Sequence, residues 1–175
     1  QNALLTSTTA SDNVAIGHCS LRANTTANDN TALGSEAMKL TTTGTRNVGI
    51  GRNGLEANTT GGNNTAVGTN ALLLNTTASN NTAIGADTLS ANTTGSCNVS
   101  VGRLSLRCNT SGCLNTAVGW NSMCKNTTGE FNTATGSRSL QCNTTGGENA
   151  GSGYNSLAAN STGCKNVAFG KSSLQ

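Results

Sequence analysis

A five-residue phrase that begins with Asn and ends with Gly occurs ten times in this chain, and each copy starts 17 residues after the previous one. The copies read NVAIG, NTALG, NVGIG, NTAVG, NTAIG, NVSVG, NTAVG, NTATG, NAGSG and NVAFG. A fixed short period through a whole chain is typical of architectures that stack one unit. Ten repeats account for nearly all of the 175 residues, so we expect one domain over residues 1–175. Both terminal repeats are incomplete, as in a segment or protomer of a longer fibre.

We number each repeat from its opening Asn. Positions 2 and 4 are mostly Val, Thr, Ile or Leu, and the alternation predicts a short strand with both side chains facing the core. Position 3 is always Ala, Gly or Ser, which predicts close approach by another backbone or chain. Position 5 is always Gly, as in a turn that needs a positive φ.

Position 9 is Leu or Met in every repeat, which predicts a second short strand with one apolar core residue per coil. Positions 12 to 15 are mostly Asn-Thr-Thr-Gly, a second turn. The predicted fold is therefore all-β: a β-solenoid (β-roll or β-helix) of about ten coils, each with two short strands and spaced by about 4.8 Å. Low-complexity disorder is the competing interpretation, because only 34% of residues are hydrophobic. The constant register of Leu and Gly argues against it, and Asn-Thr-Gly runs are poor helix formers.

The sequence contains two columns of Asn. The opening Asn residues predict a ladder of stacked amides. The alternative is that these side chains are exposed on the surface and form no ladder. They are Asn13, Asn30, Asn47, Asn64, Asn81, Asn98, Asn115, Asn132, Asn149 and Asn166. Position 12 is also Asn, except at Thr41, and each of its eight Asn residues opens an N-x-S/T glycosylation sequon. These glycosylation candidates are Asn24, Asn58, Asn75, Asn92, Asn109, Asn126, Asn143 and Asn160. The alternative for position 12 is a turn whose side chains cap the backbone. Asn63, Asn80 and Asn98 also open sequons.

Seven cysteines are accompanied by a single histidine, His18, and no C-x-x-C pair occurs, so the sequence predicts no zinc site. Cys97 and Cys113 lie one coil apart and one position out of register. Cys108 and Cys124 have the same relation, and we predict a disulfide in each pair, with buried free thiols as the alternative. The pattern assigns no partner to Cys19, Cys142 and Cys164.

Charge and motifs exclude several classes of function. The net charge is only +3 and the basic residues are scattered, so we expect no nucleic-acid partner. No apolar run approaches the length of a membrane span. One His and scattered acidic residues form no catalytic constellation, so we expect neither an enzyme nor a cofactor. Trp120 and Tyr154 share position 6, and we expect them to face solvent or to contact a neighbouring chain, with stacking on sugars as the alternative.

The stretch NTAIGADTLSANTTG, residues 81–95, resembles repeats in fibre proteins of bacteria, phages and large viruses. The NVAIG phrase is similar to the β-roll head repeats of trimeric autotransporter adhesins, whose coil is shorter. The resemblance implies a rod-like surface protein, often a homotrimer, with position 3 packed near neighbouring subunits. Seven cysteines and dense sequons are unusual for the bacterial members and indicate a eukaryotic or viral product of a secretory pathway.

The leading functional hypothesis is a structural protein of an extracellular fibre or filament, at a virion or cell surface, with N-glycans as a candidate modification. Its expected partner is another copy of itself, in a homotrimer or end to end, because an open solenoid end is a free sheet edge. One alternative is the shaft of an adhesion or receptor-binding fibre. Another is an ice-binding solenoid, since positions 13 and 14 carry regular Thr columns, although only one rank would face outward.

Overall fold

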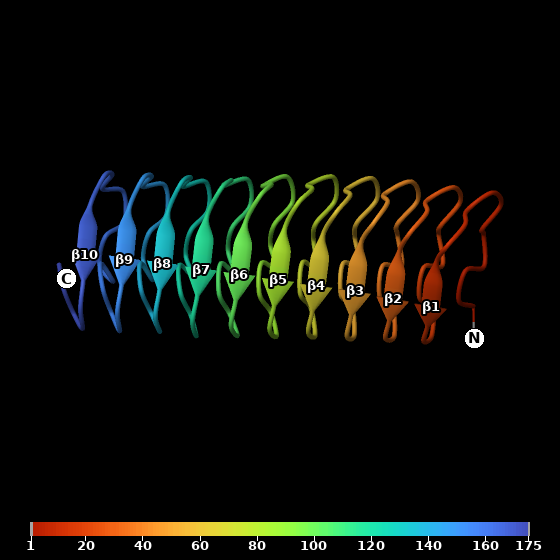
Figure 1. Cartoon of the computed structure of the whole chain (residues 1–175), viewed down its shortest axis with the longest axis horizontal. Coiled ribbons are helices and arrows are strands. Elements are labelled where there is room, and N and C mark those ends of the chain that lie inside the picture. The colour runs from red at the N-terminus through yellow and green to blue at the C-terminus, as the bar shows by residue number, and fades with distance from the viewer. Residues whose placement is uncertain (1, 175) are drawn as a thin grey trace.

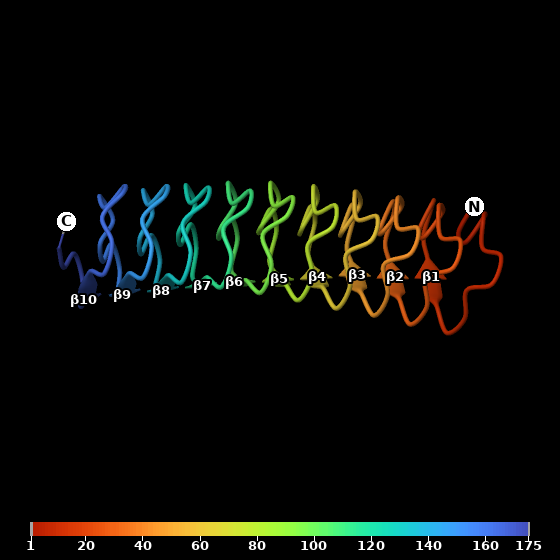
Figure 2. The same cartoon turned by 90° about the horizontal axis from the view of Figure 1, so that it is seen from above.

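The computed structural model describes residues 2–174 and forms an elongated rod of stacked coils (Figure 1). Each coil contributes one three-residue strand, and the strands form a single parallel sheet in chain order. The strands are β1 (Val14–Ile16), β2 (Thr31–Leu33), β3 (Val48–Ile50), β4 (Thr65–Val67), β5 (Thr82–Ile84), β6 (Val99–Val101), β7 (Thr116–Val118), β8 (Thr133–Thr135), β9 (Ala150–Ser152) and β10 (Val167–Phe169). The sheet lies along one side of the rod and the turns form the other side (Figure 2). The predicted all-β solenoid is confirmed.

Hydrogen bonds between coils continue beyond the sheet. Val48 N–H donates to the Asn64 carbonyl at 2.8 Å, and Leu55 N–H donates to the Ala71 carbonyl at 3.0 Å on the other side of the coil. Residues that pair across the sheet are always 17 apart, as in Val48 with Thr65. The period of the sequence is therefore the period of the backbone ladder, and one inserted residue would shift every later pair.

The strands face the opposite way from the sequence prediction. Ala66 and Ala83, at position 3, are fully buried, whereas Ile84, at position 4, is 42% exposed. The predicted core at positions 2, 4 and 9 is therefore wrong for positions 2 and 4. Of the two predicted neighbours of position 3, the structure shows a backbone and not another chain, because a Cβ at Gly49 would lie 3.0 Å from the carbonyl oxygen of Gly54 in its own coil. A coil this thin has room for one large side chain, so the strand turns its small residue inward.

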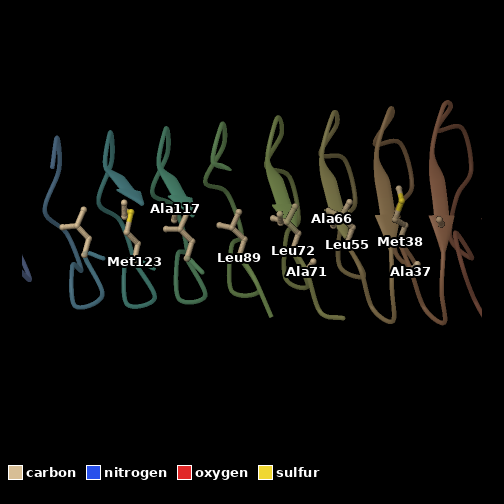
Figure 3. Packing of buried hydrophobic residues seen from close by; sticks show 14 of the residues in the cluster. Ala37, Met38, Leu55, Ala66, Ala71, Leu72, Leu89, Ala117 and Met123 are labelled. Carbon is tan, nitrogen blue, oxygen red and sulfur yellow. The ribbon is translucent and has the colours of Figure 1, made fainter. Parts of the chain in front are cut away.

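Position 9 provides that large side chain, but it does not lie in a strand. Within residues 2–174 the only strands are those at positions 2 to 4, so the predicted second strand is absent. Leu72 and Leu89 have φ of 51° and 49°, a left-handed conformation that costs roughly 1 kcal/mol or more for a bulky residue. The Leu and Met side chains follow one another along the axis of the rod (Figure 3). Their burial offsets the strained backbone.

The packing between positions 9 and 3 is tight. A Cβ added to Gly49, at position 3, would lie 2.7 Å from Cγ of Met38, at position 9 of the preceding coil. The unbranched Met38 side chain thus reaches toward a strand residue that lacks a side chain, and a Cβ there would clash with it.

The Gly at position 5 is confirmed as a residue with positive φ, between 108° and 143° in all ten copies. A Cβ at Gly68 would lie 2.5 Å from the carbonyl oxygen of Gly85 in the next coil. The turn therefore requires Gly both for its dihedral angle and for the close approach of the neighbouring backbone.

The buried interior and the outward face of the sheet can be distinguished by truncating one residue in each. We expect Leu89→Ala to lower the free energy of unfolding by about 3 kcal/mol, because it leaves a cavity in a fully packed layer. Ile84→Ala removes a similar volume from the outward face and, at concentrations where the chain is monomeric, should cost about 1 kcal/mol or less. Urea unfolding followed by circular dichroism measures both. Equal losses would contradict the observed orientation of the strands.

Candidate functional site

The opening Asn column runs through the interior of the rod and is hydrogen-bonded from coil to coil. The backbone N–H and the Nδ2 of Asn64 donate to Oδ1 of Asn47, at 2.9 and 3.1 Å. Asn64 Nδ2 also donates to the Ala78 carbonyl, at position 15 of its own coil, at 2.8 Å. These are the bonds of a buried Asn ladder, so this column is part of the scaffold.

The second Asn column, at position 12, is also inside. Asn109 Nδ2 donates to Oδ1 of Asn92 at 2.8 Å and to the Gly112 carbonyl at 2.9 Å. The same Gly112 carbonyl accepts a hydrogen bond from Asn98 Nδ2, in the first column, at 2.9 Å. The two Asn columns thus converge on the carbonyl at position 15, and both hydrogens of the Asn109 amide are used.

This geometry overturns the glycosylation candidates at position 12. An N-linked glycan is attached to Nδ2, and at these residues Nδ2 points into the coil and donates hydrogen bonds there. The residues concerned are Asn24, Asn58, Asn75, Asn92, Asn109, Asn126 and Asn143, all with no exposed surface, and the half-buried Asn160. A glycan on any of them is incompatible with the described coil. Asn98 is buried as well, so the exposed sequon residues are Asn63 and Asn80, both at position 17.

The Thr that follows each position-12 Asn explains why the sequon pattern recurs. Thr93 Oγ1 donates to the Thr110 carbonyl of the next coil at 3.1 Å, and Thr59 Oγ1 donates to the Thr76 carbonyl at 3.0 Å. The Asn-Thr phrase is therefore a turn in which both side chains bond the backbone, as the alternative interpretation held. These bonds involve position 13, whereas position 14 is the exposed Thr rank that an ice lattice would meet, so ice binding stays a prediction.

The two predicted disulfides do not form, and all seven cysteines are free thiols. Coils stack in register, so Cys113 lies beside Ser96, whose N–H donates to its Sγ at 3.3 Å, while Cys97 is exposed. Cys108 and Cys124 are near enough to influence each other, but no disulfide joins them. Burial, followed by the neighbouring Cys108, raises the pKa of the Cys124 thiol, so this group is protonated at neutral pH.

The described residues contain neither a cluster of metal ligands nor a helix that could span a membrane. Between residues 2 and 174, no three His, Cys, Asp or Glu side chains lie close enough together to hold a metal ion. The same part of the chain has no helix with the length and apolar character to cross a bilayer. The absence of enzymatic activity stays a prediction.

Two surfaces remain as functional candidates. The first is the outer face of the sheet, which we call the sheet face: positions 2 and 4 of all ten strands, where no residue is charged. Its most exposed large apolar residues are Val14, Ile16, Leu33, Ile84, Val99, Val118, Val167 and Phe169. Sequence reasoning missed this surface because it placed these side chains in the core.

The second surface is the edge that follows the Gly turn, at positions 6 and 7. Trp120 and Tyr154 are 41% and 45% exposed there, and the guanidinium carbon of Arg138 lies 4.8 Å from the centre of the Trp120 ring. The sequence pointed to the two aromatic residues but not to the arginine, since Arg138 occupies a different position of the repeat.

No family model, curated protein or solved structure matches this chain.

Thr41 is the one break in the position-12 column, and its buried hydroxyl has no hydrogen-bond partner. We expect Thr41→Asn to join Asn24 to the ladder that starts at Asn58 and to raise the free energy of unfolding by about 1 kcal/mol. Urea denaturation provides the measurement, with Thr43→Asn, on the exposed neighbouring position 14, as a neutral control. A loss of stability in Thr41→Asn would contradict the ladder geometry.

Glycan occupancy should separate the exposed sequons from the buried ones. When the chain is directed through a eukaryotic secretory pathway, we expect the folded, protease-resistant fraction to carry glycans at Asn63 and Asn80 only. Chains modified at position 12 should collect in the misfolded fraction, because the glycan occupies the space of the neighbouring coil. Peptide mass spectrometry after enzymatic deglycosylation maps the sites, and Asn63→Gln/Asn80→Gln gives the unmodified control. A glycan on Asn92 in the folded fraction would refute this prediction.

Proposed function

We propose that this chain is a structural protein that forms the shaft of a fibre on the surface of a virion or cell. The observation that carries the proposal is the in-register stack of ten coils, in which the backbone and both Asn columns bond along a single axis. Such a stack resists bending and stretching because every layer is hydrogen-bonded to the next. Its resemblance to fibre repeats supports the same role.

The proposal includes end-to-end association of separate copies, with the open end of the stack as the contact surface. A hollow of about 320 Å³ lies there, lined by Leu157, Ala159, Asn160, Asn166 and Leu174. Inside the rod the same positions are covered by the next coil. A further coil, whether it belongs to the same chain or to a second copy, would fill the hollow and continue both ladders.

Lateral assembly would use the sheet face. The face is uncharged and exposes large apolar residues on β1, β2, β5, β6, β7 and β10, and contiguous exposed apolar surface is typical of an interaction site. We propose that other copies of this chain cover it. Two copies have the same coil spacing, so the side-chain rows of one copy can fit between those of the other. A homotrimer is the arrangement that the resemblance implies.

The proposed location does not require a secretory pathway. Sequons and cysteines were the sequence arguments for that route, and both have structural explanations: position 12 builds the interior and the thiols are free. A virion or cell surface reached without N-glycosylation agrees better with eight sequons whose modification would block folding.

The assembly is tested by analytical ultracentrifugation and negative-stain microscopy of the purified chain. We expect rod-shaped oligomers, and we expect Ile84→Lys/Val118→Lys to convert them to monomers because it places charges on the sheet face. Thr94→Lys/Thr128→Lys adds the same charges at exposed position 14 and should leave the oligomer intact. A monodisperse wild-type monomer that forms no rods would refute the proposal.

A further inference from the structure

Five consecutive coils carry alternating cationic and aromatic residues along one edge of the rod. Counted from the coil that starts at Asn98, each coil adds one residue at position 6 or 7. In chain order they are Arg103, Trp120, Arg138, Tyr154 and Lys171. We call this set the aromatic–basic edge. Four of its five members are exposed and the fifth, Arg138, is half-buried.

The cations of this edge have no acidic partners. Among residues 2–174, the ion pairs involve Lys39, Arg46 and Lys165, and none of the three cations of the edge. From Asn98 onward the chain has six basic and two acidic residues, a net charge of +4. The two acidic residues lie at positions 16 and 17, away from the edge. The edge therefore presents uncompensated positive charge.

The Arg138 side chain is held in a position from which it can bind an anion. Its guanidinium lies over the Trp120 ring with 4.8 Å between the guanidinium carbon and the ring centre, and its Nε is buried without a hydrogen-bond partner. Contact with the ring restricts the side chain, so little conformational entropy is lost when the exposed nitrogens bind an acid group. Carboxylates and sulfates are the groups that a guanidinium binds with paired hydrogen bonds.

The spacing selects the kind of polymer. Neighbouring coils are about 4.8 Å apart, so residues of one kind recur every two coils, at about 10 Å. That distance is close to the length of one disaccharide in an extended polysaccharide. We propose that the aromatic–basic edge binds a linear acidic polysaccharide built from disaccharide repeats. Trp120 and Tyr154 contact the faces of sugar rings, and the three cations bind the acid groups.

A single-stranded nucleic acid fits this edge less well. Proteins that bind such strands stack successive bases on aromatic side chains. Here a whole coil separates the two aromatic residues, so successive bases cannot stack on them. The site does not depend on the proposed fibre role, because it lies on one chain and uses a different surface from the sheet face.

The proposal is tested by isothermal titration calorimetry of the full chain with three polysaccharides of equal length. Heparin carries sulfates and carboxylates, hyaluronan carries carboxylates alone, and dextran is neutral. We expect one or both acidic chains to bind and dextran not to bind. Binding by both assigns the cations to carboxylates, and binding by heparin alone assigns them to sulfates. Raising the salt concentration should weaken binding.

Variants locate the site. Trp120→Ala/Tyr154→Ala and Arg138→Ala should each reduce affinity about tenfold or more, as expected for anchor residues. Phe131→Ala and Lys125→Ala remove an exposed aromatic and an exposed cation away from the edge and should change affinity less than about twofold. Urea denaturation verifies that each variant is folded.

Three results would overturn the inference. The first is that no acidic polysaccharide binds, or that dextran binds equally well. The second is that the edge variants bind like the wild type. The third is that an oligothymidine of the same length binds more tightly than heparin and depends on the same residues, which would assign the edge to nucleic acid.

Discussion

The structure depends on buried amides that no coil can satisfy alone. The Gly95 carbonyl accepts hydrogen bonds from both Asn81 and Asn92 of its own coil, each at 2.9 Å. The Asn92 amide must also reach Asn75 in the coil before it, at 2.9 Å. A single coil would leave such groups without these partners, and a stack that lost one partner would leave a buried group unpaired at a cost of about 1–3 kcal/mol. Stacking is therefore a condition for folding, and the exact 17-residue period follows from it.

The same interior explains why the outside is apolar. Two Asn columns and one Leu or Met column fill the coil, so little space remains for the strand side chains. Position 3 must be small, and the larger residues at positions 2 and 4 turn outward. One substitution pair shows how closely the columns are coupled. Thr88 is the only Thr at position 8 and Ser100 the only Ser at position 3, and their hydroxyls are 2.7 Å apart within the core.

Period and phase were sufficient to predict the solenoid, the Gly turn and the Leu column, because these depend on which residues recur. The orientation of the strand was not predictable from hydrophobicity. Each layer of the coil has room for one large residue, so the larger and more hydrophobic residues of the strand are not the buried ones. The left-handed backbone at Leu89 carried no signal, because bulky residues normally avoid it. The sequon was misleading since Asn-Thr turns and glycosylation signals share the same letters, and only the direction of the side chain separates them.

In a repeat whose interior is fixed, functional information lies where the columns vary. Near the N-terminus the varied positions neutralise one another: Lys39 Nζ lies 3.0 Å from Glu36 and 3.7 Å from Glu56, and its hydrogen bond lowers the pKa of Glu36. Past Asn98 the same surface has cations and aromatic rings without carboxylates. Salt bridges within the rod would need carboxylates beside these cations. These cations have no acidic partner within the described residues, and their regular alternation with aromatic residues favours a partner outside the chain.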